Sequence, residues 1–587
     1  MEESRLMDTD APRPPGPTAP TPPAPPATAA THAPSVAGSL SGALRAVSGM
    51  TFLSRLFGLV RDVLLVRIFG DSAIGSAFSA AFTIPNTFRR LFGEGALSAA
   101  FIPEYTQAHK SDPARAGSLA SLTILVLTIV TSALCLLIQL ALVAVIIFAP
   151  HDADRSLSLW LTIAMLPFMP LVCIAAILAG MLQVHGRFAA SAAGPVVLNA
   201  FIIAVGMHAI LTGTRGGAVT AFALAGATVL SGLTQVLWFR KLLRANVTWT
   251  RTFGPAREAA ARMFRKFIPV VIGMGTLQIN TFLDMLITMW PIWVGPTVMG
   301  LAYPMDDASA SILAFTQRLY QFPLGVFGIA VATAAFPLLA RHADEPGKFA
   351  DVIRRGLRLS LFIGLPASLG LIAVRTDLTT TLFGGGSADT GFSAAGLERS
   401  AFVLLAYAPG VWAYSINHVL TRSFYARGDT ATPMRISIAM VFINLLLNLS
   451  LIWSMKEAGL ALATSLTAML QCLILGVILR SRLRADPRAA AADAARENLH
   501  LLDGPTARAM IRTAIASAIM FAGVLLLLHF WSSIVPAALA PHTPERWRDH
   551  AFRLICATAV GAALFAGASL ALRLPELRWL LSPRSAR

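Results

Sequence analysis

Long apolar runs, separated by short polar connections, repeat along almost the whole chain. Each run is long enough to cross a bilayer as a helix, since about 20 apolar residues span its hydrocarbon core. The runs are continuous and do not alternate between apolar and polar positions, which excludes a strand barrel. The pattern therefore predicts an all-α polytopic membrane protein with about 14 transmembrane helices. The expected spans are 44–69, 75–103, 118–149, 157–182, 191–211, 217–239, 267–291, 308–335, 356–376, 398–423, 434–454, 457–479, 509–533 and 551–573.

Basic residues are shared unevenly among the connections. The connection after the sixth span holds eight Lys and Arg against the single acid Glu258. The connection after the seventh span has Asp306 and Asp307 and no base. Cytoplasmic loops carry the excess of Lys and Arg. A multi-pass protein with both termini in the cytoplasm is therefore expected, and an even number of spans agrees with it.

Composition narrows the class further. Hydrophobic residues make up 56% of the chain and charged residues 13%, against about 25% charged in a typical soluble domain. The net charge of +17 lies in short connections and not in a soluble basic domain with interleaved aromatics, so no nucleic-acid partner is expected. The four cysteines lie in apolar runs without metal-type spacing. No nucleotide loop, zinc motif or nucleophile elbow is found, so neither an enzyme nor a metal site is predicted.

An internal repeat divides the chain. Leu91-Phe92-Gly93 recurs as Val326-Phe327-Gly328, 235 positions later, and a second short block recurs at the same shift. The repeat predicts two homologous six-helix lobes plus two C-terminal helices, and transporters built from repeats bind substrate near the midplane between them. The expected parts are a disordered Pro/Ala-rich cytoplasmic tail (1–39), an N-terminal lobe (40–240), a basic cytoplasmic loop (241–266), a C-terminal lobe (267–480), a second cytoplasmic loop (481–508), and the last two spans with a cytoplasmic tail (509–587).

Four arginines interrupt the expected spans, at a cost of about 2.5–3.5 kcal/mol each at the bilayer centre. Three lie in the first half, and Arg318 is expected to be the lone strong charge of the second half's core, facing them across a cleft. A guanidinium presents a fixed fork of donors that fits phosphate oxygens two at a time and keeps its charge when desolvated. Several forks around one cavity favour a diphosphate over a carboxylate or a drug cation. The predicted substrate-binding residues are Arg55, Arg61, Asp62, Arg89 and Arg318.

Some neighbouring charges have simpler explanations. Arg67 is expected to extend to the membrane interface. Arg90 and Glu94 are four positions apart and are expected to neutralise each other on one helix. Arg89 is left without an obvious local partner. Gly58 lies between Arg55 and Arg61 and is a candidate for a bend.

Polar residues in later spans suggest a second, weaker site. Asn280, Asn444, Asn448 and Thr464, with Asp284 nearby, carry the oxygen ligands that a small hard cation requires. The alternative is that they form hydrogen bonds between helices.

Three segments resemble the MurJ (MviN) family of lipid II flippases. They are residues 48–70, which include Arg61-Asp62, residues 82–98, which include Arg89-Arg90, and residues 318–326, which look like the family's eighth span. The resemblance implies the fold of the multidrug/oligosaccharidyl-lipid/polysaccharide exporters. It also implies that the arginines matching Arg55, Arg61, Arg89 and Arg318 line a central cavity and are needed for function, and that the lipid tail lies in a groove bordered by the last two helices.

The chain departs from the family pattern at a few positions. Ser76 stands where many relatives carry Asp, and Gln317 replaces an acid before the matching arginine. Some relatives bind sodium with acids near Asn280 and Asn448, which are neutral here.

The expected function is translocation by alternating access across a bacterial inner (cytoplasmic) membrane, and the resemblance implies that the substrate is undecaprenyl-diphosphate-linked peptidoglycan precursor. Expected partners are that polyprenyl-diphosphate lipid, membrane lipids and cell-wall synthesis machinery. No cofactor is expected, and coupling to Na⁺, H⁺ or the membrane potential stays open. Alternatives are an exporter of another polyprenyl-linked oligosaccharide, a multidrug antiporter and a non-transporting scaffold.

Overall fold

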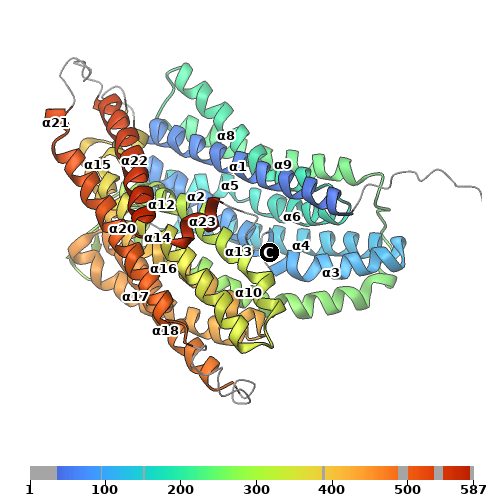
Figure 1. Ribbon diagram of the computed structural model, residues 1–587. Coiled ribbons are helices and arrows are strands. Elements are labelled where there is room, and N and C mark those ends of the chain that lie inside the picture. The colour runs from blue at the N-terminus through green and yellow to red at the C-terminus, as the bar shows by residue number, and fades with distance from the viewer. Residues whose placement is uncertain are drawn as a thin grey trace, which may run out of the picture.

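A computed structural model describes residues 36–93, 96–149, 152–385, 391–486, 500–534 and 546–581. Within these ranges the chain is a bundle of helices with one short antiparallel hairpin (Figure 1). Nine of the described helices are long and apolar enough to cross a membrane. Most of the predicted tail lies outside the described residues, and helix α1 already begins at Val36, inside the predicted range 1–39.

Each of the six expected spans in the N-terminal half coincides with one helix or with a pair of helices. Local chemistry sets several of the boundaries: the Ser72 hydroxyl accepts a hydrogen bond at the start of α2, and Asp112 caps α4, whose first residue is Pro113. The elements are α1 (Val36–Phe69), α2 (Ala73–Phe88), the π-helical turn η1 (Arg89–Gly93), α3 (Ala96–Ser111), α4 (Pro113–Phe148), α5 (Ala153–Met165), α6 (Phe168–Val184), α7 (Phe188–Ala192), α8 (Gly194–Leu211) and α9 (Ala218–Leu243).

The C-terminal half and the last two spans follow the same scheme. The elements are η2 (Gly254–Ala256), α10 (Arg257–Thr288), α11 (Trp290–Trp293), β1 (Thr297–Val298), β2 (Leu301–Ala302), α12 (Ser309–Pro323), the π-helical turn η3 (Leu324–Gly328), α13 (Ile329–Arg341), α14 (Pro346–Phe383), α15 (Ala394–Tyr407), η4 (Ala408–Gly410), α16 (Val411–Ala426), α17 (Ala431–Met455), α18 (Glu457–Arg484), α20 (Gly504–His529), α21 (Trp531–Ile534), α22 (Arg546–Ala571) and α23 (Pro575–Leu581).

Both halves interrupt the same spans. The second and eighth spans each contain a five-residue π-helical turn, η1 and η3, displaced by the 235 positions of the sequence repeat. The fourth and tenth spans each break at a proline, Pro167 and Pro409. Because a proline lacks the backbone N–H that a helix interior uses, such breaks are fixed by sequence. The repeated breaks agree with the internal repeat.

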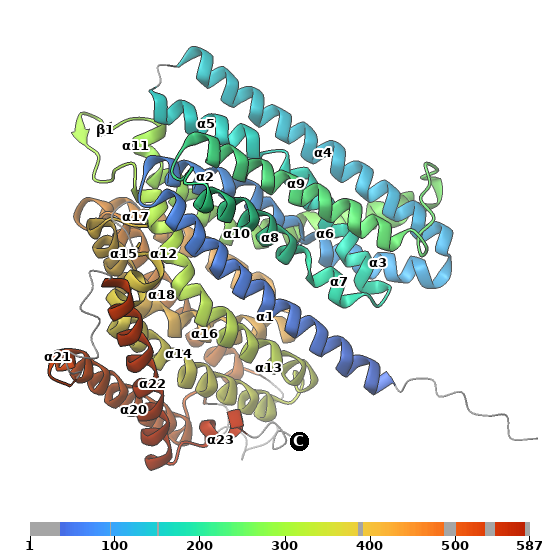
Figure 2. The same cartoon turned by 90° about the horizontal axis from the view of Figure 1, so that it is seen from above.

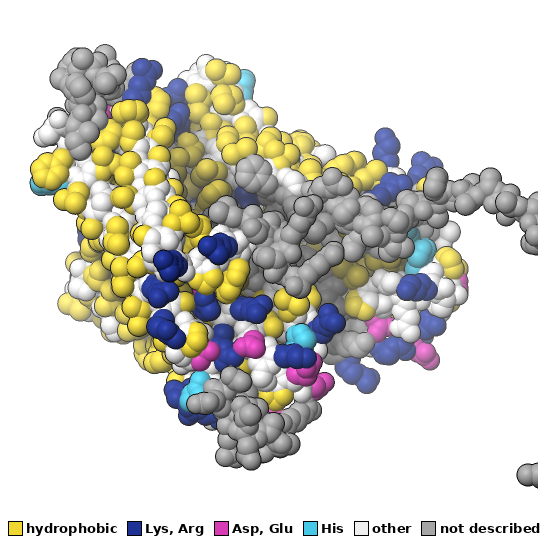
Figure 3. Space-filling model, viewed as in Figure 1, with side chains coloured by type: hydrophobic (Ala, Val, Ile, Leu, Met, Phe, Trp, Pro, Cys, Tyr) yellow, Lys and Arg dark blue, Asp and Glu magenta, His cyan; other side chains and the backbone are white. Residues whose placement is uncertain are grey.

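The last two spans pack on one side of the bundle. Helices α20 and α22 lie against each other and against α14, at the edge remote from α4 in both views (Figures 1 and 2). Hydrophobic side chains cover much of this face over α20 and α22, whereas Lys and Arg gather on its lower part (Figure 3).

The two halves touch closely at the end of the bundle where α1 finishes, here called the Gly70 end. The Ser311 N–H donates to Ser76 Oγ at 3.0 Å, and Ser311 Oγ donates to the Gly70 carbonyl at 2.9 Å. Asp71 accepts from the Ser393 N–H at 2.8 Å and from its hydroxyl at 2.6 Å. The hydrogen bonds of Ser311 and Asp71 therefore join the halves at this end.

An arginine-lined cavity

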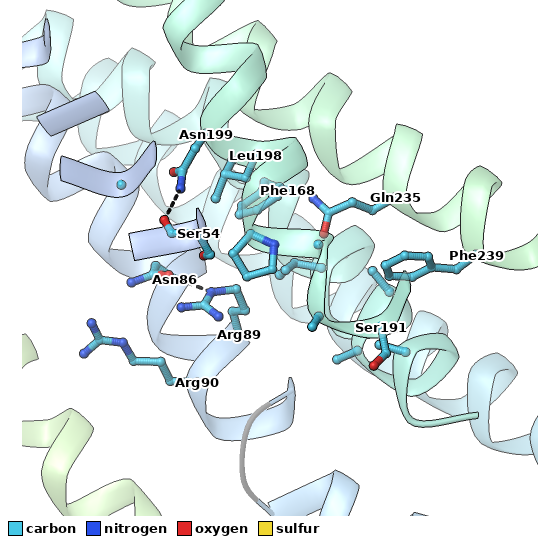
Figure 4. Close-up of a pocket in the computed structure, with 18 of the residues that line it drawn as sticks. Ser54, Asn86, Arg89, Arg90, Phe168, Ser191, Leu198, Asn199, Gln235 and Phe239 are labelled. Atoms are coloured by element: carbon cyan, nitrogen blue, oxygen red, sulfur yellow. Dashed lines mark hydrogen bonds between the residues drawn. The ribbon is translucent and has the colours of Figure 1, made fainter. Parts of the chain in front are cut away.

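A cavity of about 660 Å³ lies mainly inside the N-terminal half (Figure 4). Helices α1, α2, α6, α8 and α9, with η1, form most of its wall, and the C-terminal half contributes Arg318. All four arginines predicted from the sequence line it, and so does Arg90. The repeat predicted a site midway between the two halves. The cavity instead lies mainly in the N-terminal half.

Asp62 joins two of these arginines across the halves. Its Oδ1 accepts hydrogen bonds from Arg61 at 3.0 Å and 2.8 Å, and its Oδ2 lies 3.3 Å from Arg318 Nε. Asp62 and Arg61 are almost fully buried, whereas a third of the Arg318 side chain is exposed. One carboxylate thus holds together a guanidinium of α1 and a guanidinium of α12.

Arg61 is held in place by two further groups that the sequence reasoning missed. Its Nη1 donates to Asn199 Oδ1 on α8 at 2.9 Å, and its guanidinium lies 5.5 Å from the centre of the Phe82 ring. Asn199 also donates to the Ser54 carbonyl at 3.2 Å (Figure 4). A buried amide within an otherwise apolar span was the signal that could have identified Asn199. Helix α1 is continuous through Gly58.

Arg89 and Arg90 reach the cavity from η1. The expectation that Arg89 lacks a local partner is wrong, because its Nε donates to Asn86 Oδ1 at 2.9 Å (Figure 4). The expected pairing of Arg90 involves Glu94, which lies outside the described residues. A π-helical turn adds a residue to the regular helical turn, and it places both consecutive arginines on the cavity wall.

Arg55 meets the other π-helical turn. A Cβ atom added to Gly325 in η3 would lie only 2.8 Å from Arg55 Cζ. No side chain larger than hydrogen fits there without moving the guanidinium. Arg55 therefore depends on a glycine of the opposite half for its position.

Arg318 is not the only strong charge in the helices of the second half, contrary to the prediction. Arg422 lies in α16. Asp377 is buried in α14, with Oδ1 2.6 Å from His550 Nδ1 and 3.6 Å from Arg553 Nε. The spacing of charges along one sequence did not show these pairings, which join α14 to α22.

The group of residues proposed for a cation is only partly assembled. Asn448 Nδ2 donates to Asp284 Oδ1 at 2.8 Å and to Asn444 Oδ1 at 3.1 Å, and Asn444 in turn contacts Thr467 Oγ1 at 3.4 Å. The Thr464 hydroxyl instead bonds to a carbonyl of its own helix. Asn280 is not part of this hydrogen-bonded chain.

A charged cluster fixes the start of the helix that carries Arg318. Arg399 pairs with Asp306 at 2.8 Å and also with Glu457, and Ser309 donates to Glu457 at 2.5 Å. Burial alone would raise the pKa of the Asp306 carboxyl, but the hydrogen bonds and charge of Arg399 outweigh it, so that this pKa is lowered.

The helices and their arrangement define the class as a polytopic membrane protein with the multidrug-exporter fold. A solved inward-facing multidrug resistance MATE family transporter of the MOP superfamily is similar in fold, with a TM-score of 0.59, 12% identity, and coverage of 75% of this chain and 98% of that chain. A structure titled "Lipid II flippase MurJ, inward closed conformation" has a TM-score of 0.68 and 21% identity over 90% of this chain and 98% of its own.

Sequence comparison names the family. The family model "Lipid II flippase MurJ" matches residues 65–545. A Vibrio cholerae protein described as "Probable lipid II flippase MurJ" is 32% identical over 447 residues, covering 73% of this chain and 81% of its own length. The chain therefore belongs to the MurJ family of lipid II flippases, which are transporters and not enzymes.

Proposed function

We propose that this protein translocates undecaprenyl-diphosphate-linked peptidoglycan precursor (lipid II) across the bacterial cytoplasmic membrane by alternating access. The observation that carries the proposal is the cavity: five guanidinium groups line it, and the described lining residues include no carboxylate. Such a site favours a multivalent anion, since each fork binds phosphate oxygens in pairs. The names of the relatives supply the particular lipid.

The conformation described here suits uptake of substrate from the cytoplasm. Spans alternate in direction, so Gln183 at the end of α6 lies at the end of the bundle opposite Gly70. The basic connections share that end, and the positive-inside rule makes it cytoplasmic together with both termini. The cavity extends to Gln183 and Ser191, while hydrogen bonds between the halves close the Gly70 end. Residues 40–240 and 267–480 act as the two rocking lobes.

Asp62 links substrate binding to movement of the lobes. Its carboxylate lies between Arg61 and Arg318 and contacts both guanidinium groups, as a phosphate would. An entering diphosphate competes for both guanidinium groups and, by replacing Asp62, changes the tie between the lobes. The polyprenyl tail stays in lipid, and cell-wall synthesis machinery consumes the product on the outer face.

The membrane potential contributes to the return of the unloaded carrier. The empty cavity is cationic, so a cytoplasm-negative potential draws it back toward the inner face. Each full charge moved is worth about 2.3 kcal/mol per 100 mV.

Complementation of a lipid II flippase depletion tests the proposal. The wild-type chain restores growth and Arg89→Ala does not, whereas the control Arg67→Ala, an exposed residue of the same helix as Arg55, restores it. Full growth with Arg89→Ala would refute the role of the cavity. Competition with another polyprenyl-linked oligosaccharide and resistance to cationic dyes distinguish the two alternative transporters.

A further inference from the structure

The cavity has two chemically different parts (Figure 4). Arg89, Arg90 and Asn86 lie toward one side of the close-up, whereas Ser191, Gln235 and Phe239 lie toward the other. The second part, called the neutral wing here, is lined by uncharged residues of α6, α7 and α9. It is defined by Ala175, Ala176, Ala179, Gln183, Ser191 and Gln235.

Small residues keep the neutral wing open. Ala179 lies three positions after Ala176 and four after Ala175, so these alanines lie on neighbouring parts of one face of α6. Gly194 at the start of α8 completes the wall: a Cβ added there would lie 2.9 Å from Gln235 Oε1. Leucine-sized side chains at these positions would fill the space. Small residues on α6 and at the start of α8 thus keep the neutral wing open.

Two amide side chains supply polar atoms to the wing. Gln235 is only 5% exposed; its Nε2 donates to the Ser231 carbonyl at 3.2 Å, and its Oε1 has no hydrogen-bond donor among the described residues. That oxygen faces the cavity beside Gly194 (Figure 4). The Gln183 side chain is exposed where the cavity opens toward the cytoplasm, and no described residue forms a hydrogen bond with its side-chain amide. An amide oxygen that faces a cavity without a protein donor is free to accept a hydrogen bond from a ligand.

The size and chemistry of the wing fit a sugar. Pockets of about 300–1,000 Å³ hold ligands of drug size, so 660 Å³ is more than a diphosphate alone requires. An uncharged wall with amide donors and acceptors suits a neutral, hydroxylated or acetamido group. Its position next to the arginines means that such a group must be attached to the anion.

We propose that the neutral wing binds the first sugar attached to the diphosphate, with Gln235 and Gln183 as its hydrogen-bonding residues and the α6 alanines as the surface against which it packs. This inference rests on the proposed function and deepens it. It makes the wing a specificity site, which distinguishes a glycosylated polyprenyl diphosphate from the bare one.

The test compares two probes on the purified full-length protein. Farnesyl diphosphate and farnesyl diphosphate bearing one N-acetylhexosamine are titrated against wild type, Ala179→Leu, Gln235→Met and Arg89→Ala. Ala179→Leu fills the wing and is expected to weaken the glycosylated probe at least tenfold. Gln235→Met removes the amide at nearly constant volume, and a several-fold loss is expected. Both variants bind the bare diphosphate within twofold of wild type.

The controls separate this inference from the function beneath it. Ala204→Leu, an exposed position of α8 outside the cavity lining, leaves both affinities unchanged. Arg89→Ala weakens both probes; if it weakened neither, the diphosphate site itself would be wrong. If Arg89→Ala behaves as expected but the wing variants weaken both probes equally, or neither, the sugar assignment is overturned while the flippase proposal stands.

Discussion

Both halves of the molecule contain a π-helical turn at the same place in the repeat, but the two turns differ in their side chains and surroundings. In the first half, η1 carries Arg89 and Arg90 and borders a cavity. In the second half, the sequence of η3 is Leu-Gly-Val-Phe-Gly, without a charge. Next to η3, Tyr320 stacks on Tyr407 with ring centres 4.5 Å apart and on Tyr414 at 6.1 Å.

The repeat alone would predict the same role for both halves, whereas this difference indicates a different role for each. The first half surrounds the hollow and contributes all of its described lining except Arg318. The second half is packed with aromatic rings and presents Arg318 and Gly325 to the first. We infer that one lobe holds the headgroup and that the other senses it.

The largest effect is expected from the charged turn of the first half. Arg89→Ala should slow lipid II translocation in proteoliposomes by about 10–100-fold, because a charge-assisted hydrogen bond contributes about 1.5–3 kcal/mol. Arg89→Lys should be nearly as slow, since an ammonium lacks the fork. Rates close to wild type for either variant would mean that the charge of η1 is not needed, so that η1 would be equivalent to the uncharged turn η3.

The tie between the halves is tested by Asp62→Asn. Removing this charge leaves Arg61 and Arg318 facing each other, which should destabilise the empty protein by up to about 3 kcal/mol. A polyprenyl diphosphate should then raise the melting temperature more in the variant than in wild type, because it restores the missing anion. The exposed Asp307→Asn serves as control. Equal ligand-induced shifts would contradict the role assigned to Asp62.

A smaller effect is expected at the glycine that accommodates Arg55. Gly325→Ala should slow translocation several-fold by displacing the guanidinium, because the new methyl group collides with it. Gly370→Ala in α14 adds the same methyl group in open space and should leave the rate unchanged. If the two alanine variants had the same rate, Arg55 would not depend on the second half.

The smallest effect is expected at the Gly70 end. Ser76→Ala leaves the Ser311 N–H without its acceptor, a loss of about 1 kcal/mol. In a protein without native cysteines, labelling of a cysteine at Ser79 by a membrane-impermeant maleimide from the outer side should rise about fivefold, the factor to which that energy corresponds. Ser450→Ala removes only a bond within its own helix. Unchanged labelling would show that this bond does not hold the halves closed.

The sequence predicted the helices better than it predicted which side chains contact one another. All fourteen expected spans coincide with helices, because about 20 apolar residues identify a span wherever it packs. The breaks inside the second, fourth, eighth and tenth spans were not predicted. The arginines were recognisable because their burial is costly. Their placement on one cavity wall follows from the structure.

Contacts between distant segments could not be predicted in the same way. The Asn199 bond to Arg61 and the glycine under Arg55 join positions more than a hundred residues apart, and helical periodicity says nothing about which helices meet. The hydrogen-bonded chain that includes Asp284 was only partly predicted, for the same reason. Asn444 and Asn448 share a helix face, whereas Thr467 belongs to another helix.

The most direct test of the account is a structure of the full-length protein in lipid nanodiscs with undecaprenyl diphosphate bound. The account predicts phosphate density within hydrogen-bond distance of Arg89 and Arg318, with Asp62 separated from Arg318. Phosphate density outside this cavity, or an Asp62–Arg318 pair that keeps its distance of 3.3 Å, would contradict it.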